Sequence, residues 1–256
     1  MTLDLGTFSP KKTTLGFSKP PQLRQFGTEN LSEVVLRPSD TVDDVTRKIG
    51  LATILGTIQS ALTDFRYVRP IWKKNAEEER LLGVSFTGVF DCPVVLNATP
   101  DQLDAWKASA VFMNNVWAKK MSINPSAAIT CIKPSGTVSQ LTGVAGSGLH
   151  PSYAKHYIRR IRQDKKDPLN QALIDAEIEH EEDPYNKEAI VFSFPMKVDR
   201  GAVFRTDMSA VEQLELWLTY QKHWCEHKPS VTISVKESEW MEVGSWVYKN
   251  FDWMSG

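Results

Sequence analysis

The chain has 256 residues, of which 41% are apolar and 24% charged, and its formal net charge is −1 at pH 7. This composition is typical of a globular protein and excludes disordered and collagen-like classes. A near-zero net charge gives no global basic field, so neither nucleic acid nor a membrane surface is expected as the main partner. No apolar run approaches the roughly 20 residues that span a bilayer. The N-terminus lacks the apolar core of a secretory signal. We therefore expect a cytoplasmic α/β protein.

The first half of the chain predicts a strand followed by a long helix. Residues 1–27 are rich in Pro, Gly, Lys and Thr and predict an irregular arm. The β-branched run 31–36 predicts a strand. Thr41 and Asp44 then form a capping box, after which apolar residues recur at spacings of three and four as far as Leu62. This spacing predicts one amphipathic helix with a single buried face.

Further elements alternate between strand and helix along the chain. An apolar stretch interrupted by Gly83 and Gly88 is followed by a predicted helix over 101–121 and by a short buried strand over 127–133. In the second half we expect helices over 167–183 and 209–228 and strands over 189–197 and 230–235. Strands that alternate with long helices predict parallel βα units with the helices packed outside.

The cysteines and histidines indicate no metal site. Cys92, Cys131 and Cys225 lie far apart without CxxC spacing, so they form neither a zinc motif nor a disulfide framework. We expect all three to be buried packing residues. His223 and His227 have helical i,i+4 spacing but no HExxH pattern, so we expect a surface or partly buried pair rather than metal ligands.

The segment 131–151, CIKPSGTVSQLTGVAGSGLHP, combines a predicted strand end with small and hydroxyl residues. Small residues let backbone N–H groups approach an anion, and hydroxyls add donors, so the segment could hold a phosphate. It is not a Walker A loop, because no Gly-Lys-Ser/Thr follows a four-residue spacer. A plain strand-to-helix turn would use the same residues. The following basic residues could help hold a polyphosphate or form a solvated face; they are Lys155, Arg159, Arg160 and Arg162.

Four ordered segments carry a resemblance to a known family. They are ENLSEVVLRPSDTVDDVTRKIGLATILGTIQSALTDFRY, EEERLLGVSFTGVFDCP, TCIKPSGTVSQLTGVAGSGLHPSYAKHYIRRIR and PSVTISVKESEWMEVGSWVYKNFD. Together they resemble the C-terminal half of the catalytic domain of adenosylcobalamin-dependent (class II) ribonucleotide reductases of the triphosphate-reductase-like type. The resemblance covers about Asn30 to Asp252. It implies that residues 30–256 form the second half of a ten-stranded α/β barrel, a parallel half-barrel with outer helices, and that residues 1–29 are an arm outside it.

The resemblance also implies site residues and ligands. The substrate, a ribonucleoside di- or triphosphate, would place its phosphates on the loop formed by Pro134, Ser135, Gly136, Thr137, Val138 and Ser139. Gly146, Ser147, Gly148 and His150 would form the pocket wall where substrate and adenosylcobalamin meet. A thioredoxin-type protein or another dithiol would supply reducing equivalents for deoxyribonucleotide biosynthesis.

The radical chemistry of the family requires residues that this sequence lacks. In the family, a thiyl-radical cysteine, an Asn and a Glu lie on an Asn-Pro-Cys-Gly-Glu finger loop, shortly before a Cys-Asn-Leu segment. Here Glu29 stands before Asn30-Leu31, and no residue before Cys92 carries a thiol. We therefore expect no catalytic residue in this chain and a need for the N-terminal part of the same reductase. Both ends of the chain resemble cuts in a longer enzyme, as a split, intein-interrupted or truncated gene would produce.

Two other functions stay open at this point. The chain could be a non-catalytic remnant or a nucleotide-binding accessory protein that keeps the phosphate loop. It could also be an unrelated α/β phosphate-binding enzyme with its own acid/base pair. Asp64, Asp91 and Glu33 are candidates for that pair, although nothing in their spacing distinguishes them.

Overall fold

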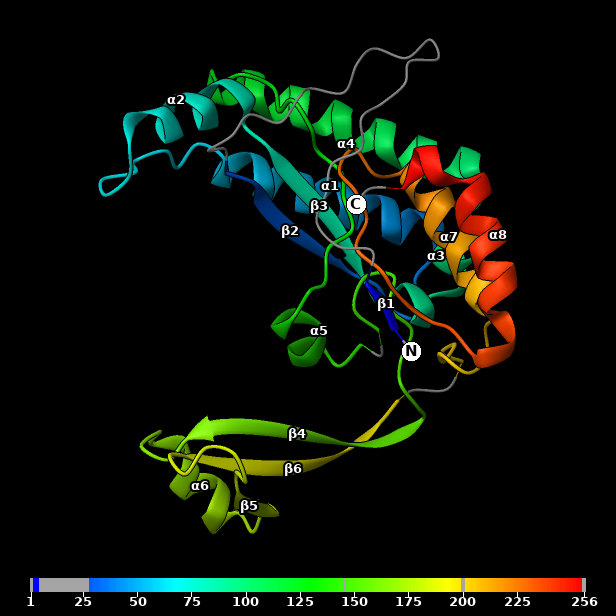
Figure 1. The fold of residues 1–256 in the computed structure, drawn as a ribbon. Coiled ribbons are helices and arrows are strands. Elements are labelled where there is room, and N and C mark those ends of the chain that lie inside the picture. Colours follow the sequence, from blue (N-terminus) through cyan, green and yellow to red (C-terminus); the bar gives the residue numbers. More distant parts are fainter. Residues whose placement is uncertain (1, 5–27, 145, 199–200, 255–256) are drawn as a thin grey trace. The chain divides into compact units, whose positions relative to one another are not determined.

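The computed structural model describes residues 2–4, 28–144, 146–198 and 201–254, which form a mixed α/β protein (Figure 1). The chain divides into a larger unit, Met1–Ser152 with Gly201–Gly256, and a smaller unit, Tyr153–Arg200. The strands are β1 (Thr2–Asp4), β2 (Asn30–Val35), β3 (Leu82–Thr87), β4 (His156–Asp164), β5 (His180–Glu182), β6 (Ala189–Lys197) and β7 (Thr232–Ser234). The α-helices are α1 (Val42–Gln59), α2 (Pro70–Glu79), α3 (Pro93–Leu96), α4 (Pro100–Met121), α5 (Thr137–Thr142), α6 (Leu169–Asp175), α7 (Ala210–His223) and α8 (Trp240–Lys249). Short 3₁₀ segments lie at Val89–Asp91, Glu237–Glu239 and Phe251–Trp253.

The larger unit is built on a parallel pair of strands. β2 and β3 pair in parallel from Asn30↔Leu82 to Val35↔Thr87, and α1 packs on both strands and against α4. A third segment lies beside β3, where Thr130 forms a parallel bridge with Val84. The strand predicted over 127–133 is therefore reduced to one bridge, although it has the predicted direction. The parallel arrangement expected for the first half of the chain is confirmed.

Aromatic side chains hold the helices of the larger unit against β3. The ring of Phe86 stacks on Trp224 with centroids 4.4 Å apart and meets Trp106 and Tyr220 edge-on at 6.5 Å each. The Trp224 indole donates to the Cys131 carbonyl at 2.9 Å. These contacts join α4, the end of α7 and the segment beside β3 into one core.

The capping box at the start of α1 is confirmed, but the predicted single apolar face of the helix is not. Thr41 Oγ1 accepts from the Asp44 amide, and the Asp44 carboxylate accepts from the Thr41 amide. Val45 and Ile49 are buried, whereas Leu55 is 65% exposed. Helical spacing alone identified the apolar positions, and it could not show that some of them point away from the core.

The C-terminal part of the larger unit follows its predicted elements. Ser209 caps α7 in a second capping box, with Glu212 as its partner, and the Trp217 indole donates to the Pro229 carbonyl at 2.9 Å. β7 pairs antiparallel with β1. The prediction of an irregular arm over 1–27 is therefore wrong for residues 2–4, which form β1. Residues 5–27 of the predicted arm lie outside the described residues.

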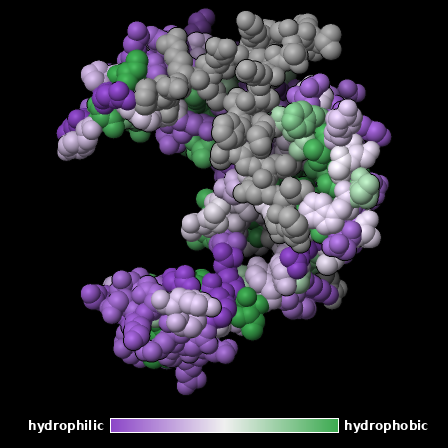
Figure 2. Space-filling view, in the orientation of Figure 1, coloured by the Kyte–Doolittle hydropathy of each residue, from purple (hydrophilic) through white to green (hydrophobic). Residues whose placement is uncertain are grey.

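The parallel strand arrangement predicted for the second half of the chain is wrong for the smaller unit. Its strands are antiparallel in the order β4-β6-β5, with register from His156↔Lys197 to Asp164↔Ala189. The helix predicted over 167–183 is confined to α6, because Glu177 adopts a left-handed φ of 57° and the chain then enters β5. Figure 2 shows a mostly hydrophilic surface on this unit, which accords with its charged strands. Strand propensity does not specify the direction of pairing.

The described residues do not close a barrel. The larger unit has one parallel pair with a bridged third segment, so the half-barrel expected from the resemblance is seen only as mixed α/β structure. Within the described part of the chain, no helix combines the length and apolarity that crossing a membrane requires.

A buried amide on α4 provides a test of this packing. Asn114 donates to Thr57 Oγ1 and Ser126 Oγ and accepts from the Ser126 amide, each at 2.9 Å. Asn114→Ala should lower the free energy of unfolding by about 2–3 kcal/mol, because three buried hydrogen bonds are lost. Urea denaturation measures the change. Asn115→Ala, at the exposed neighbouring position, should change it by no more than about 0.5 kcal/mol. Equal effects of the two variants would contradict this packing.

Candidate functional site

Three hydroxyl side chains from separate segments meet where β3 ends. Thr87, the last residue of β3, has its Oγ1 2.9 Å from Ser135 Oγ. Ser147 Oγ lies 3.0 Å from Ser135 Oγ and accepts from the Ser135 amide at 2.7 Å. The two segments predicted from sequence, 134–139 and 146–150, are thus brought together. Thr87 was not predicted; the only signal for it is its position at the end of a strand, directly before Gly88.

Glycines shape the backbone around these hydroxyls. Gly88 has a φ of 85° and turns the chain directly after β3, and its amide donates to the Gly146 carbonyl at 2.9 Å. Gly136 has a φ of 53°, and a Cβ atom there would meet no heavy atom within 4 Å. The backbone at Gly136 is therefore open, as an anion-binding loop requires.

The predicted phosphate loop divides into exposed and buried residues. Pro134, Gly136, Thr137 and Val138 are exposed, and Ser135 is partly buried. Ser139 is 1% exposed, and its Oγ donates to the Gly136 carbonyl at 3.1 Å. Ser139 therefore stabilises the turn from inside and does not face a ligand. The phosphate-binding role of the other five residues stays a prediction.

Two glycines of the predicted pocket wall pack closely against other parts of the chain. A Cβ at Gly146 would lie 2.4 Å from the His150 carbonyl oxygen, and one at Gly148 would lie 3.0 Å from Ile132 Cγ2. His150 Nδ1 lies 2.8 Å from the Ser147 carbonyl oxygen. The two glycines permit close packing of the chain. Among Gly146, Ser147, Gly148 and His150, Ser147 is the residue whose side chain contacts the hydroxyl of Ser135.

A carboxylic acid on β2 lies on the same face of the sheet as Thr87. Glu33 pairs in register with Ser85, two residues before Thr87, and Ser85 Oγ donates to Glu33 Oε1 at 3.1 Å. Ser85 Oγ also accepts from the Lys133 amide, directly before the loop, at 3.1 Å. Burial raises the pKa of Glu33 to about 7, and the hydrogen bond from Ser85 opposes the rise. Glu33 can therefore hold or release a proton near neutral pH.

The other two acid/base candidates have different surroundings. Asp64 is exposed and forms an ion pair with Arg66 at 2.8 Å. Asp91 is 5% exposed, in the 3₁₀ segment after β3. Glu33 combines a pKa raised to about 7 with a hydrogen-bonded link, through Ser85, to the Lys133 amide directly before the loop.

The cysteines are buried, as expected. Cys92, Cys131 and Cys225 are free thiols, and burial raises the pKa of each. A buried thiol with a raised pKa remains protonated and unreactive at neutral pH.

The histidine pair and its surroundings carry no metal site. His223 Nδ1 lies 2.9 Å from Asp104 Oδ2, and His227 Nε2 lies 3.6 Å from Glu29 Oε1. Burial lowers the pKa of His227, and the neighbouring Glu29 carboxylate opposes this. Across the residues that the structure describes, no group of three or more His, Cys, Asp or Glu side chains could hold a metal ion.

The basic residues of β4 form ion pairs inside the smaller unit. Arg160 contacts Glu181, and Arg162 contacts Asp183, whose side chain is only 1% exposed. These pairs favour the solvated-face interpretation over a polyphosphate clamp. A phosphate would have to compete with a carboxylate for either guanidinium.

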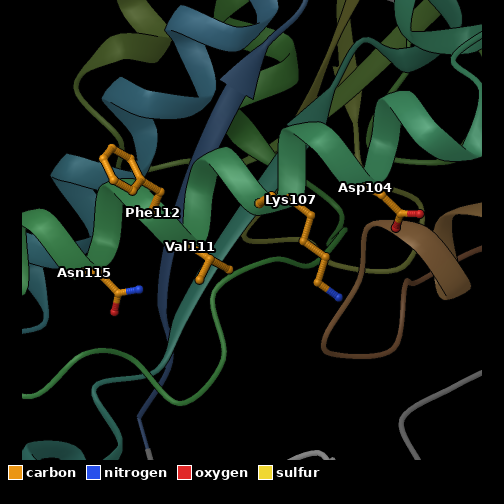
Figure 3. Close-up of a pocket in the computed structure, with 6 residues that line it drawn as sticks. Asp104, Lys107, Val111, Phe112 and Asn115 are labelled. Carbon is orange, nitrogen blue, oxygen red and sulfur yellow. The ribbon is translucent and has the colours of Figure 1, made fainter. Parts of the chain in front are cut away.

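The two cavities described here lie away from the loop residues. One, of about 450 Å³, follows α4 and is lined by Asp104, Lys107, Val111 and Phe112 among others (Figure 3). The other, of about 340 Å³, lies on the paired strands β4 and β6. The candidate site is therefore described by its loop residues and not by either of these two cavities.

The chain is similar in sequence to known proteins. No family model matches the chain. It is 30% identical over 147 residues to the adenosylcobalamin-dependent ribonucleoside-triphosphate reductase of Lactobacillus acidophilus, a match that covers 56% of this chain and 20% of that protein. The reductase of the same name from Lacticaseibacillus paracasei is 27% identical over 207 residues, covering 69% of this chain and 27% of that protein.

A solved structure shares the fold. The crystal structure of a B12-dependent (class II) ribonucleotide reductase superposes with a TM-score of 0.72 and 22% identity, over 90% of this chain and 36% of that chain. The chain thus spans about a fifth to a quarter of the length of these curated relatives. By sequence and fold, the chain is homologous to part of the adenosylcobalamin-dependent (class II) ribonucleotide reductases.

Proposed function

We propose that this chain contributes the substrate-phosphate loop of a ribonucleotide reductase and works together with the part of the enzyme that carries the radical cysteine. The proposal rests on the cluster of three hydroxyl side chains, Thr87, Ser135 and Ser147, beside the open backbone of Gly136. Ligands of open α/β sheets bind outside the carboxyl ends of the strands, and this cluster lies at the carboxyl end of β3. The substrate would be a ribonucleoside triphosphate, the class named for the relatives.

The three hydroxyls suit a phosphate because each can redirect its hydrogen bond. In the structure they bond to one another, with Oγ–Oγ distances of 2.9 and 3.0 Å. A phosphate oxygen would accept from Ser135 and Ser147 in a charge-assisted bond, which is stronger than a bond between neutral groups. Ser135 is held for this role by its own amide, which donates to Ser147 Oγ.

Adenosylcobalamin, when bound, supplies the radical by homolysis of its cobalt–carbon bond. On their Cβ side Gly146 and Gly148 pack against His150, Ile132 and Lys133. We assign the cofactor to the remainder of the enzyme, together with the reducing dithiol, because the resemblance places the radical cysteine outside this chain. This chain would bind and orient the nucleotide, and Glu33 would hold a proton beside the loop.

The second candidate, a non-catalytic nucleotide-binding protein, is favoured by the surroundings of Glu29. Glu29 occupies the position where the resemblance predicts a cysteine. Its Oε1 and the sulfur of Cys131 lie within 3 Å of the same point beside Gly83, and His227 is 3.6 Å from that oxygen. A carboxylate at this position cannot take part in a disulfide, which supports a chain that binds nucleotides without reducing them.

The phosphate role of the loop is tested by two glycines with positive φ, 53° at Gly136 and 67° at Gly143, each with open space around it. Gly143 is in the left-handed helical region, where Gly143→Ala should cost about 1–2 kcal/mol. Gly136 has a ψ of −107°, outside that region, so Gly136→Ala should destabilise the fold more, and urea denaturation of each variant establishes how much folded protein is titrated. Gly136→Ala should weaken ribonucleoside triphosphate binding about tenfold or more, because it reshapes the backbone at the anion. Gly143→Ala should leave the affinity unchanged.

Calorimetric titration measures both affinities, on the chain alone and on its mixture with a complementary polypeptide. We define this polypeptide as the N-terminal part of the L. acidophilus reductase, up to the segment that this chain matches. Equal affinities for the two variants would show that the loop is only a turn. Binding to the chain alone would favour the non-catalytic candidate.

The raised pKa of Glu33 predicts a pH-dependent stability. The folded state binds the proton up to about pH 7, whereas an unfolded glutamate releases it near 4.5. Wild-type stability should therefore fall as the pH rises from about 4.5 to 7 and stay lowered above it. Glu33→Gln, which remains neutral, should not show this fall and should gain relative to wild type at pH 8. Urea denaturation at pH 5 and pH 8 measures the difference; parallel behaviour of the two proteins would contradict a raised pKa.

A further inference from the structure

Ser85 lies between a carboxyl group and the start of the phosphate loop. It is a fully buried residue of β3, and its Oγ donates to Glu33 Oε1 at 3.1 Å and accepts from the Lys133 amide at 3.1 Å. The same Oγ lies 3.4 Å from the Lys133 carbonyl oxygen. A hydroxyl has one proton to donate. Ser85 can therefore donate to Glu33 or to the Lys133 carbonyl, but not fully to both.

The direction of the Ser85 hydroxyl depends on the proton of Glu33. An ionised carboxylate only accepts hydrogen bonds, so it takes the bond from Ser85. A protonated carboxyl can instead donate to Ser85 Oγ, and the Ser85 hydroxyl is then free to donate to the Lys133 carbonyl. In this second arrangement Ser85 holds both the N–H and the C=O of Lys133. Burial raises the pKa of Glu33 to about 7, so both arrangements are populated near neutral pH.

The backbone of Lys133 leads directly into the loop. Pro134 follows it, and a proline ring fixes φ at about −65°, so the orientation of the Lys133 peptide is passed on to Ser135. A Cβ at Gly148 would lie 3.1 Å from the Lys133 carbonyl oxygen, so this oxygen also contacts the second loop segment. A hydrogen bond from Ser85 to the Lys133 carbonyl would therefore hold both segments of the loop.

The Glu33 carboxyl is close enough to the hydroxyl cluster to respond to a bound phosphate. Ser85 and Thr87 are two residues apart on β3, so their side chains lie on one face of the sheet, about 7 Å apart along the strand. Glu33 pairs in register with Ser85 on the neighbouring strand. The carboxyl is therefore about 10 Å from the cluster. A triphosphate bound there carries several negative charges, which disfavour the ionised form of a nearby carboxylate.

Other ionisable groups lie near Glu33 on the same side of the sheet. They are the Cys131 thiol and two residues whose charges, with that of Glu33, act on this thiol, namely Glu29 and Lys133. Burial raises the pKa of Cys131 well above its ordinary range, so the thiol stays protonated at neutral pH. Of these groups, Glu33 is the one whose side chain is hydrogen-bonded to Ser85.

The helices that pack on β2 were also searched for charges that face Glu33. Lys48 of α1 reaches the Val35 carbonyl of β2 at 2.9 Å, but its ammonium group is paired with Asp40 at 2.6 Å. The helix α5, which also contacts β2, carries no ionisable side chain. Among the described residues of these helices, none supplies a counter-charge that would keep Glu33 ionised when a phosphate binds.

We propose that Ser85 is a positioning residue for the phosphate loop, and that Glu33 controls it by taking up a proton when nucleotide binds. The proton passes from solvent to the Glu33 carboxylate, and the Ser85 hydroxyl then turns to the Lys133 carbonyl. Nucleotide affinity should therefore fall as the pH rises above about 7. The inference rests on the proposed function, since it takes the loop as the phosphate site.

Calorimetric titration with ATP at pH 7.5, in two buffers of different ionisation enthalpy, counts the protons taken up on binding. The sample is the full chain mixed with the complementary polypeptide, without Mg²⁺. The wild type should take up about half a proton more per nucleotide than Glu33→Gln, whose side chain is neutral at any pH. Protons exchanged by ATP itself cancel in this comparison. The matched control is Glu29→Gln, which removes another carboxyl on the same side of the sheet and should keep the wild-type uptake.

A pH series tests the role of Ser85. Relative to Glu33→Gln, the affinity of the wild type should fall about fivefold between pH 6.5 and 8.5, because the glutamine amide can donate to Ser85 Oγ as the protonated carboxyl does. Ser85→Ala should bind ATP more weakly at every pH and take up fewer protons. Ser85→Thr, which keeps the hydroxyl, should recover both properties in part. Circular dichroism of each variant establishes that the fold is retained.

The outcomes separate this inference from the proposed function. Equal proton uptake by the wild type and Glu33→Gln, with ATP bound by both, would overturn the inference and leave the proposed function in place. Loss of the uptake in Glu29→Gln would also overturn it, because the proton would then not belong to Glu33. Failure of the wild type to bind ATP would contradict the proposed function, and the inference with it.

Discussion

The parallel pairing of β2 with β3 is the constraint on which the rest of the larger unit depends. A parallel pair cannot be joined by a tight turn, so α1 must cross over the sheet between the two strands. This crossover buries one face of β3 against aromatic side chains of α4 and α7. The pairing also brings the carboxyl ends of both strands to the same edge, where the chain turns at Gly88 and Thr87 can meet two later loops.

The polar groups at this edge form two hydrogen-bonded groups. Ser85 joins the Glu33 carboxyl to the Lys133 amide, and Ser135 joins Thr87 to Ser147. Buried polar groups are costly unless they are hydrogen-bonded, and here each side chain supplies a partner to the next. On the proposed phosphate role, an arriving phosphate would exchange bonds with the hydroxyls of Ser135 and Ser147.

Local signals in the sequence predicted the elements well but not their partners. The capping box at Thr41 placed the start of α1, because its contacts involve residues three apart. The similar box at Ser209, which begins α7, was not predicted, although its Glu212 partner is also three residues away. The antiparallel pairing of β4 with β6 was missed, since strand composition does not specify direction. Ser135 and Ser147 were predicted as members of two loops, but Thr87, 48 residues before Ser135, could be assigned to them only by the fold.

The central claim is a division of labour in which this chain holds the nucleotide and its partner supplies the radical. Co-purifying the chain with the complementary polypeptide and assaying ribonucleoside triphosphate reduction tests the claim most directly. The account predicts deoxyribonucleotide formation that requires both polypeptides, adenosylcobalamin and a dithiol, and none from either polypeptide alone. A complex that binds nucleotide yet forms no deoxyribonucleotide would contradict it and would point to Glu29, in place of a cysteine, as the mark of a non-catalytic protein.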